Sequence, residues 1–219
     1  MRREIVVFGR VPLAGRVKTR LAAGIGAVAA AEVYRLLLDH ALAEARAAGP
    51  TVVLALAEAA PPGVDWRPPP GVALEIQSDG DLGARMCAAF NRRFAAGADA
   101  VVLVGSDLPG LSSGGLADAF SGLDEAPVVL GPSDDGGYWL VGQRRPGCDL
   151  FSRIPWSSPG VLESTRRRLL ELGIAHAELP RLRDLDTVED LRALAADSTV
   201  PEGLRVRFDE YASGNDEAL

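Results

Sequence analysis

The sequence predicts an α/β protein with a mainly parallel sheet, and two observations lead to this fold class. Short apolar runs that fit buried strands alternate along the chain with longer segments whose apolar residues recur at helical spacing. The run AVVLVG at residues 100–105 is apolar throughout, as expected of a central strand covered on both faces. The chain has 219 residues, 47% of them hydrophobic, which is enough to bury the core of one domain.

The predicted strands are apolar runs bounded by turn residues. They cover residues 5–8, 51–57, 73–77, 100–105, 127–131, 138–142 and 175–180. The fifth and sixth are joined by a stretch containing Asp135-Gly136-Gly137, which is most simply a hairpin connection. The proline-rich stretch at residues 60–71 is expected to be a surface loop.

The predicted helices combine strong helix formers with start and stop signals. They cover residues 27–48, 82–97, 114–120, 158–172 and 187–195. Gly97 and Gly173 end the second and the fourth, and Thr187 is expected to cap the last, with Asp190 as its capping-box partner. We predict a single domain over residues 1–195, followed by an acidic C-terminal tail over residues 196–219, whose last residues, 211–219, are expected to be frayed.

The charge balance limits the classes of partner. There are 23 basic and 30 acidic residues, a net charge of −7, whereas a general nucleic-acid binder carries a basic face. No segment approaches the length of apolar chain that crosses a bilayer, and the first residues lack the hydrophobic region of a signal peptide. Cys87 and Cys148 form no CxxC pair and are expected to be buried thiols in a reducing compartment. We therefore expect a cytoplasmic protein with neither nucleic acid nor membrane as a partner.

The loop after the first strand, GRVPLAGRVKTRL, is unusually basic for an acidic chain. Arg10, Arg16, Lys18 and Arg20 lie where α/β sheets bind their ligands, and such charges repel one another unless an anion lies between them. The loop is not a Walker A motif, because two residues separate Gly15 from the lysine, and it lacks the glycine spacing of a dinucleotide loop. It is either a phosphate-binding loop, which we favour, or a solvated basic turn.

Several carboxylates follow predicted strands in the same way. Asp107 comes directly after the strand at residues 100–105, and Asp184 and Asp186 follow the last strand with the i, i+2 spacing that points side chains to one side. Asp107 and Asp186 are candidate ligands for a divalent cation, although a turn residue and a helix cap are the simpler alternatives. Gly136 and Gly137 would let a ligand approach the backbone closely, if they do more than form a hairpin. No G-x-S-x-G motif or trusted histidine arrangement supports a triad hydrolase.

Taken in order, the blocks FGRVPLAGRVKTRL, SDGDLGARM, GSDLPGL, GPSDDGGYWLVG, IPWSSPGVLESTRRRLLELG and LPRLRDLDTVEDL resemble the DUF2064 family. That family is described as glycosyltransferase-like, with some members linked to arsenosugar biosynthesis. VKTRLAAGIG, together with the DGG and DLDTVEDL blocks, is also similar to 2-phospholactate guanylyltransferase.

The resemblance implies a mixed, mostly parallel sheet flanked by helices, the glycosyltransferase type A or nucleotide-diphospho-sugar transferase fold. It further implies a nucleotide held by two groups of contacts and a divalent ion, Mg²⁺ or Mn²⁺, held by two carboxylates. The phosphate contacts would be Arg10, Gly15, Lys18 and Arg20, the base or ribose contacts Gln77, Gly83 and Arg85, and the metal ligands Asp107 and Asp186.

Such a site can support two reactions. In glycosyl transfer a small-molecule acceptor attacks the anomeric carbon of a nucleotide-sugar, and Asp135 or Asp134 is the candidate base. In nucleotidyl transfer a phosphorylated metabolite attacks a nucleoside triphosphate, and the single acid of GSDLP is typical of that class. Lys18 and Arg20 would act electrostatically on the leaving group in either case. We predict glycosyl transfer, with nucleotidyl transfer or an inactive nucleotide-binding module as the alternatives.

Overall fold

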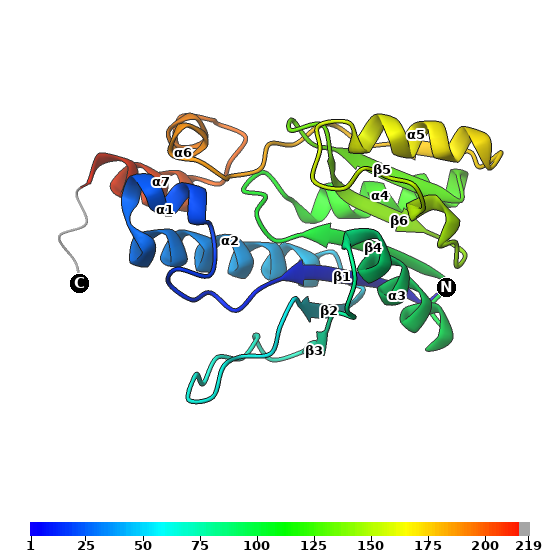
Figure 1. The fold of residues 1–219 in the computed structure, drawn as a ribbon, viewed down its shortest axis with the longest axis horizontal. Coiled ribbons are helices and arrows are strands. Elements are labelled where there is room, and N and C mark those ends of the chain that lie inside the picture. The colour runs from blue at the N-terminus through cyan, green and yellow to red at the C-terminus, as the bar shows by residue number, and fades with distance from the viewer. Residues whose placement is uncertain (215–219) are drawn as a thin grey trace.

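The structure, a computed structural model, describes residues 1–214 and confirms the predicted fold class. Its sheet has seven strands in the order β3-β2-β1-β4-β6-β5-β7 (Figure 1). These are β1 (Arg3–Gly9), β2 (Thr51–Leu56), β3 (Val72–Ile76), β4 (Ala100–Gly105), β5 (Val128–Pro132), β6 (Tyr138–Gln143) and β7 (His176–Glu178). β6 runs antiparallel to β4 and β5, and the other neighbouring pairs are parallel, so the sheet is mixed and mostly parallel.

Helices cover both faces of this sheet (Figure 1). The elements are α1 (Thr19–Ile25), α2 (Ala27–Ala47), α3 (Leu82–Ala95), α4 (Ser113–Glu125), the short 3₁₀ helix η1 (Asp149–Phe151), α5 (Val161–Glu171), α6 (Val188–Ala195) and α7 (Glu202–Ser213). Alternate residues of β1 enter opposite layers: Ile5 and Val7 pack with α2 and α4, and Val6 packs with α3, η1 and α5. This two-sided burial explains why the strands are apolar runs instead of alternating patterns.

A third cluster joins α1, α6 and α7 to the outer side of α2, at one end of the molecule (Figure 1). It is built on buried side chains such as Leu21, Leu37 and Leu191. Gly24 lets α1 approach α6, because a Cβ atom there would lie 2.2 Å from a side-chain carbon of Val188. The local pattern at residues 19–25 predicts no helix, since a glycine in a seven-residue segment weakens the helical pattern.

The prediction of a C-terminal tail is wrong for half of its length, 12 of 24 residues. Residues 202–213 form α7, whose Phe208 and Tyr211 are buried against the third cluster. Their aromatic side chains lie three residues apart on one helix face, and this short apolar stripe outweighs the acidic composition around it. Residues 215–219, the end of the predicted tail, lie outside the described part of the chain. Among residues 1–214, no helix combines the length and the apolar character needed to cross a bilayer.

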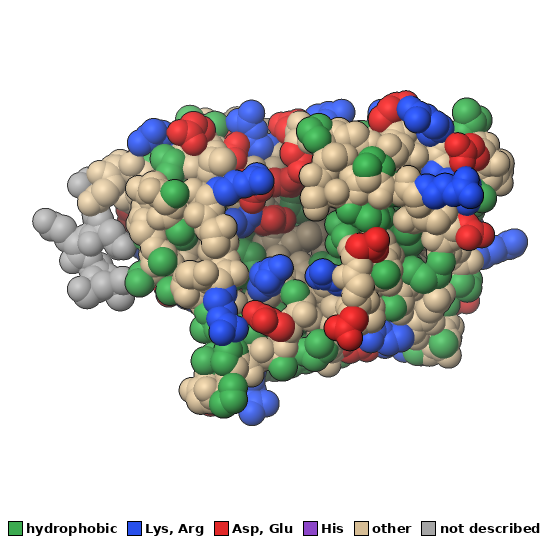
Figure 2. Space-filling model, in the orientation of Figure 1, with side chains coloured by type: hydrophobic (Ala, Val, Ile, Leu, Met, Phe, Trp, Pro, Cys, Tyr) green, Lys and Arg blue, Asp and Glu red, His purple; other side chains and the backbone are tan. Residues whose placement is uncertain are grey.

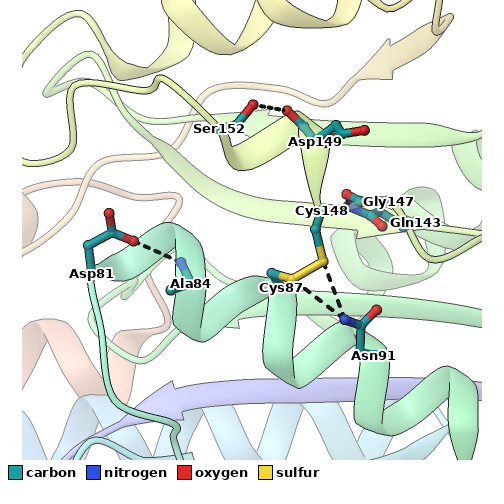
Figure 3. The surroundings of a disulfide bond; sticks show 9 residues. All are labelled: Asp81, Ala84, Cys87, Asn91, Gln143, Gly147, Cys148, Asp149 and Ser152. Atoms are coloured by element: carbon teal, nitrogen blue, oxygen red, sulfur yellow. Dashed lines mark hydrogen bonds between the residues drawn. A yellow bond between two sulfur atoms is a disulfide. The ribbon is translucent and has the colours of Figure 1, made fainter.

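The prediction of free thiols is also wrong. Cys87 of α3 and Cys148, just before η1, form a disulfide, and the side-chain amide of Asn91 donates to both sulfur atoms (Figure 3). The two cysteines are 61 positions apart, and the packing of η1 on α3 brings them together. Sequence spacing does not report such a long-range contact. The cysteines therefore give no support to a reducing compartment.

Candidate functional site

A cleft of about 620 Å³ opens where β1 and β4 end. The chain moves outward from β1 to β2 and β3, and then returns to place β4 on the other side of β1. Open α/β sheets bind ligands at such a reversal of strand order. The cleft is lined by Phe8, Gly9, Arg10, Arg16, Val17, Lys18, Thr19, Arg20, Tyr34, Ala57, Gln77, Leu82, Arg85, Gly105, Ser106, Asp107 and Asp186. Figure 2 shows a hollow in this face with acidic and basic side chains along its rim.

The basic loop between β1 and α1 forms one wall. Val11 and Val17 anchor its two ends in the core, at 4% and 3% exposure, so the charged residues between and beside them face the cleft. Arg10 and Arg20 are exposed and form no ion pair with any residue of the described chain, whereas Arg16 lies 3.5 Å from Glu58. The loop thus leaves basic side chains available to an anion.

The side chain of Lys18 is almost fully buried and reaches the acidic residues of the cleft. Its Nζ donates to Asp186 Oδ1 at 2.7 Å and to Asp107 Oδ2 at 3.0 Å. Burial by itself lowers the pKa of Lys18, but the charges of Asp107 and Asp186 reverse the effect, so the pKa is raised and the amine is charged. The residue also has a left-handed backbone, with φ 46° and ψ 48°, which non-glycine residues adopt rarely and mostly at functional sites.

The segment that carries Asp186 is held against the end of β4. The backbone N–H of Leu185 donates to the carbonyl of Asp107 at 3.0 Å. Thr187 caps α6 and forms the predicted capping box with Asp190, which confirms that Asp186 is not needed as the cap. Burial, with the nearby charges of Asp107 and Asp135, raises the pKa of Asp184 to about 8. Carboxylates from three separate segments therefore gather on this side of the cleft.

Tyr34 of α2 is a site residue that the sequence analysis does not identify. Its buried hydroxyl accepts a hydrogen bond from the backbone N–H of Arg10 at 2.8 Å and lies 2.9 Å from Ser106 Oγ. It therefore ties the end of β1 to the end of β4. Burial raises the pKa of Tyr34, so the phenol stays neutral. The sequence feature that could have identified Tyr34 is a tyrosine within an alanine- and leucine-rich helix. Such a helix buries the tyrosine, and a buried hydroxyl requires a hydrogen-bond partner.

Of the residues assigned to the base or ribose, Gln77 and Arg85 line the cleft and Gly83 does not. Gln77 donates to the carbonyl of Ala55 at 2.8 Å, and Arg85 Nε donates to that of Gly80 at 2.9 Å, so both side chains are held. Gly83 packs on Trp156, whose indole would lie 2.7 Å from a Cβ at that position. Packing against this indole explains the glycine without a ligand.

Three further predicted residues lie outside the lining of the cleft. Gly15 forms a turn with φ 77°, where the N–H of Arg16 bonds to the carbonyl of Leu13. Gly136 and Gly137 belong to the turn between β5 and β6, which confirms the hairpin. Gly136 has φ 88°, and a Cβ there would lie 2.0 Å from the carbonyl oxygen of Pro159. These glycines are accounted for by backbone geometry and packing.

Asp135 lies in the same hairpin. Its Oδ1 accepts hydrogen bonds from the Ser133 hydroxyl and, at 2.8 Å, from the Gly137 N–H. Asp135 is exposed, and its charge acts on half-buried Asp184. Asp135 is therefore near the acidic side of the cleft without being part of its lining.

Two carboxylates of the cleft are candidate ligands for a divalent cation. Among residues 1–214, no group of three or more His, Cys, Asp and Glu side chains is arranged to hold a metal ion. Asp107 and Asp186 do converge, because both bind one cationic nitrogen, that of Lys18. Mg²⁺ is commonly held by one or two carboxylates, with water and substrate phosphates as its other ligands. The pair therefore fits a cation that binds together with a phosphorylated ligand.

Comparison with known proteins places the chain in a family. The family model described as "Uncharacterized protein conserved in bacteria (DUF2064)" matches residues 38–158, more than half of the chain. The protein belongs to the DUF2064 family. The match covers Gln77, Arg85 and Asp107, whereas the basic loop and Asp186 lie outside it. None of the curated proteins matches the sequence.

Solved structures extend the comparison beyond the matched segment of this DUF2064 protein. A protein of Desulfovibrio desulfuricans G20, described as a "putative nucleotide-diphospho-sugar transferase", has 28% identity and a TM-score of 0.87, and 98% of each chain is covered. Rv0371c from Mycobacterium tuberculosis H37Rv has 21% identity and a TM-score of 0.58 over 89% of this chain and 97% of its own. CMP:2-keto-3-deoxy-manno-octonic acid synthetase, solved with CTP, has 17% identity and a TM-score of 0.54 over 90% and 99%. The predicted fold is thereby confirmed.

Proposed function

We propose that this DUF2064 protein is a metal-dependent transferase that moves a glycosyl group from a nucleotide-diphospho-sugar to a small-molecule acceptor. The observation that carries the proposal is the arrangement of one cleft, in which the basic loop faces the convergent carboxylates of Asp107 and Asp186. The similarity to the D. desulfuricans protein, at 28% identity over nearly the whole of both chains, supports this class of reaction.

The basic wall suits the diphosphate of the donor. Arg10, Lys18, Arg20 and Arg85 all line the cleft, and guanidinium and ammonium groups bind phosphate oxygens through charge-assisted hydrogen bonds. When the donor's bond to the sugar breaks, negative charge develops on the departing diphosphate. Cations fixed beside that position stabilise the transition state more than the ground state, which accelerates the reaction.

Asp107 and Asp186 would hold the divalent ion. Once bound, such an ion neutralises charge on the phosphate oxygens of the leaving group. A structure of Rv0371C, at 21% identity and a TM-score of 0.50, is described as a complex with manganese, which supports testing that metal first. Oxygen ligands suit Mg²⁺ as well.

The acidic side of the cleft favours a neutral acceptor. Besides burial, the charges of Asp107 and Asp135 act on this side of the cleft strongly enough to raise the pKa of Asp184, so an anionic phosphate acceptor would be repelled there. A sugar or alcohol hydroxyl is uncharged and would not be repelled. As its oxygen bonds to the anomeric carbon, its proton passes to Asp135 and the nucleoside diphosphate leaves. Asp135 Oδ2 can accept that proton, because the hydrogen bonds from described residues go to Oδ1.

Nucleotidyl transfer is the second candidate, and the size of the basic wall favours it. Arg10, Arg16, Lys18, Arg20 and Arg85 provide more positive charge than a diphosphate needs, and would match a triphosphate. In that reaction an ionised phosphate of the acceptor attacks the α-phosphorus, pyrophosphate leaves, and no protein base is required.

The products and the ligand preference separate these candidates. A thermal-shift panel of nucleotide-sugars and nucleoside triphosphates, each with and without Mn²⁺, measures binding through stabilisation of the native state. We expect a nucleotide-sugar to give a large Mn²⁺-dependent shift, followed by release of nucleoside diphosphate when an acceptor is added. A response to one triphosphate alone, with pyrophosphate as product, would replace glycosyl transfer by nucleotidyl transfer. Binding without turnover of any donor would leave a nucleotide-binding module.

A pair of variants tests the metal ligands. Asp107→Asn is expected to lose the Mn²⁺-dependent part of the shift, because it removes one of the two convergent carboxylates. Asp118→Asn, an exposed residue of α4 away from the cleft, is the matched control and should keep it. An undiminished Mn²⁺ response in Asp107→Asn would show that the metal assignment is wrong.

A further inference from the structure

We propose that Lys18 serves as a built-in counter-ion for the metal-binding carboxylates, so that the divalent cation binds strongly only together with the nucleotide. This inference rests on the proposed function for the identity of the two ligands. It concerns the order in which they bind, which neither the fold nor the family comparison addresses.

The geometry is that of a cation already held by the two carboxylates. Nζ of Lys18 lies 2.7 Å from Asp186 Oδ1 and 3.0 Å from Asp107 Oδ2, and the three residues come from three separate segments of the chain. The lysine side chain is 5% exposed, whereas those of Asp107 and Asp186 are 38% and 47% exposed. The carboxylates therefore face the cleft, and the ammonium neutralises them from beneath.

Helix capping does not account for the position of Lys18. It occupies the N-cap position of α1, but its side chain makes no capping hydrogen bond. Its left-handed backbone is unusual for a residue with a Cβ, and such conformations persist only where the surroundings determine them. Here the determining contacts are the two ion pairs, so the loop is held in the conformation that brings the ammonium to the carboxylates.

Electrostatics gives the consequence. A divalent cation that approaches Asp107 and Asp186 meets a pair whose charge is already half neutralised, and it is repelled by the ammonium itself. A nucleotide changes this balance, because its phosphates give Lys18 a new anionic partner on the same wall of the cleft. Metal and nucleotide then favour each other's binding, and by linkage the enhancement must be equal in both directions.

The test is the affinity for Mn²⁺ alone, followed by electron paramagnetic resonance of the free ion. We expect Lys18→Met, which removes the charge and keeps the length of the side chain, to bind Mn²⁺ at least about tenfold more tightly than the wild type. Lys18→Arg keeps the charge and should remain weak. Arg16→Met is the matched control, since it removes a charge from the same cleft at a residue that pairs with Glu58 instead; its Mn²⁺ affinity should stay within about twofold of the wild type.

A second measurement uses only the wild-type protein. A saturating nucleoside diphosphate should raise the affinity of the protein for Mn²⁺ about tenfold or more. The Mn²⁺ that free nucleotide binds is subtracted first. Equal Mn²⁺ affinity with and without the nucleotide, or a Lys18→Met variant that folds and binds Mn²⁺ no better, would overturn the inference. Both readouts are independent of turnover, so a protein that transfers no glycosyl group would refute the proposed function and leave this result standing.

Discussion

Removal of the disulfide between Cys87 and Cys148 is expected to lower the free energy of unfolding by about 4 kcal/mol. The bond links positions 61 residues apart and so restricts the unfolded chain; the chain-entropy relation gives about 4 kcal/mol for a loop of that length. The perturbation is the double variant Cys87→Ala/Cys148→Ala, compared with the wild type before and after reduction. Agreement between the reduced wild type and the variant separates the effect of the cross-link from that of the substituted side chains.

The assay is urea unfolding followed by tryptophan fluorescence, because Trp156 lies on the segment that the disulfide ties to α3. With a denaturant slope of roughly 2–3 kcal/mol per molar, the transition midpoint should fall by roughly 1.3–2 M. The bond also holds the neighbourhood of Gly83, on which Trp156 packs, so the variant should lose the T-shaped contact of that indole with Tyr138 before the rest unfolds. A loss below about 1 kcal/mol, or free thiols in the purified oxidised protein, would refute the reasoning.

Three further outcomes are expected. Gly136→Ala should cost at least about 2 kcal/mol more in unfolding free energy than Gly15→Ala, because both have positive φ but only Gly136 has a backbone oxygen 2.0 Å from the added Cβ; equal costs in urea unfolding would contradict this. Hydrogen bonds from Arg166 hold the pKa of Glu178 below its ordinary value, so this carboxylate stabilises the fold above about pH 4.5 and the benefit is lost as the pH falls through the folded-state pKa. The stability difference between wild type and Glu178→Gln should therefore shrink between pH 6 and pH 3 and with added salt, and a constant difference would contradict the assignment. Tyr34→Phe leaves the backbone N–H of Arg10 and the hydroxyl of Ser106 without their partner. It should lower the free energy of unfolding by about 1–3 kcal/mol and weaken nucleotide binding measured by calorimetry. Unchanged values of both would argue against a role of Tyr34 in holding the ends of β1 and β4 together.

Local sequence patterns predict the elements whose signals are local. Buried strands appear as apolar runs, as in β4, and α2 and α6 carry their own start or stop signals. The capping box of Thr187 and Asp190 even predicts that Asp186 is left free for another role, as observed. α1 and α7 depend on packing in the third cluster. The roles of Gly24 and Phe208 follow from the residues they contact in that cluster and not from the local sequence.

The residues of the candidate site also differ in how well local sequence predicts them. The carboxyl ends of β1 and β4 meet because the strand order reverses there, so Lys18 and Asp107, which follow those strands, can be brought together from sequence. The direct contact between them is not predictable, since it depends on the left-handed backbone of Lys18. The glycines are the least reliable candidates: Gly83 serves the packing of Trp156, which lies 73 positions away in the chain and gives no local signal.

A crystal structure with a nucleoside diphosphate and Mn²⁺ would show whether both ligands bind in the cleft. We expect the anomalous manganese signal to lie against the carboxylates of Asp107 and Asp186, and the diphosphate to face Arg10, Lys18 and Arg20. A nucleotide bound outside the cleft at the ends of β1 and β4, or manganese in contact with neither carboxylate, would contradict it.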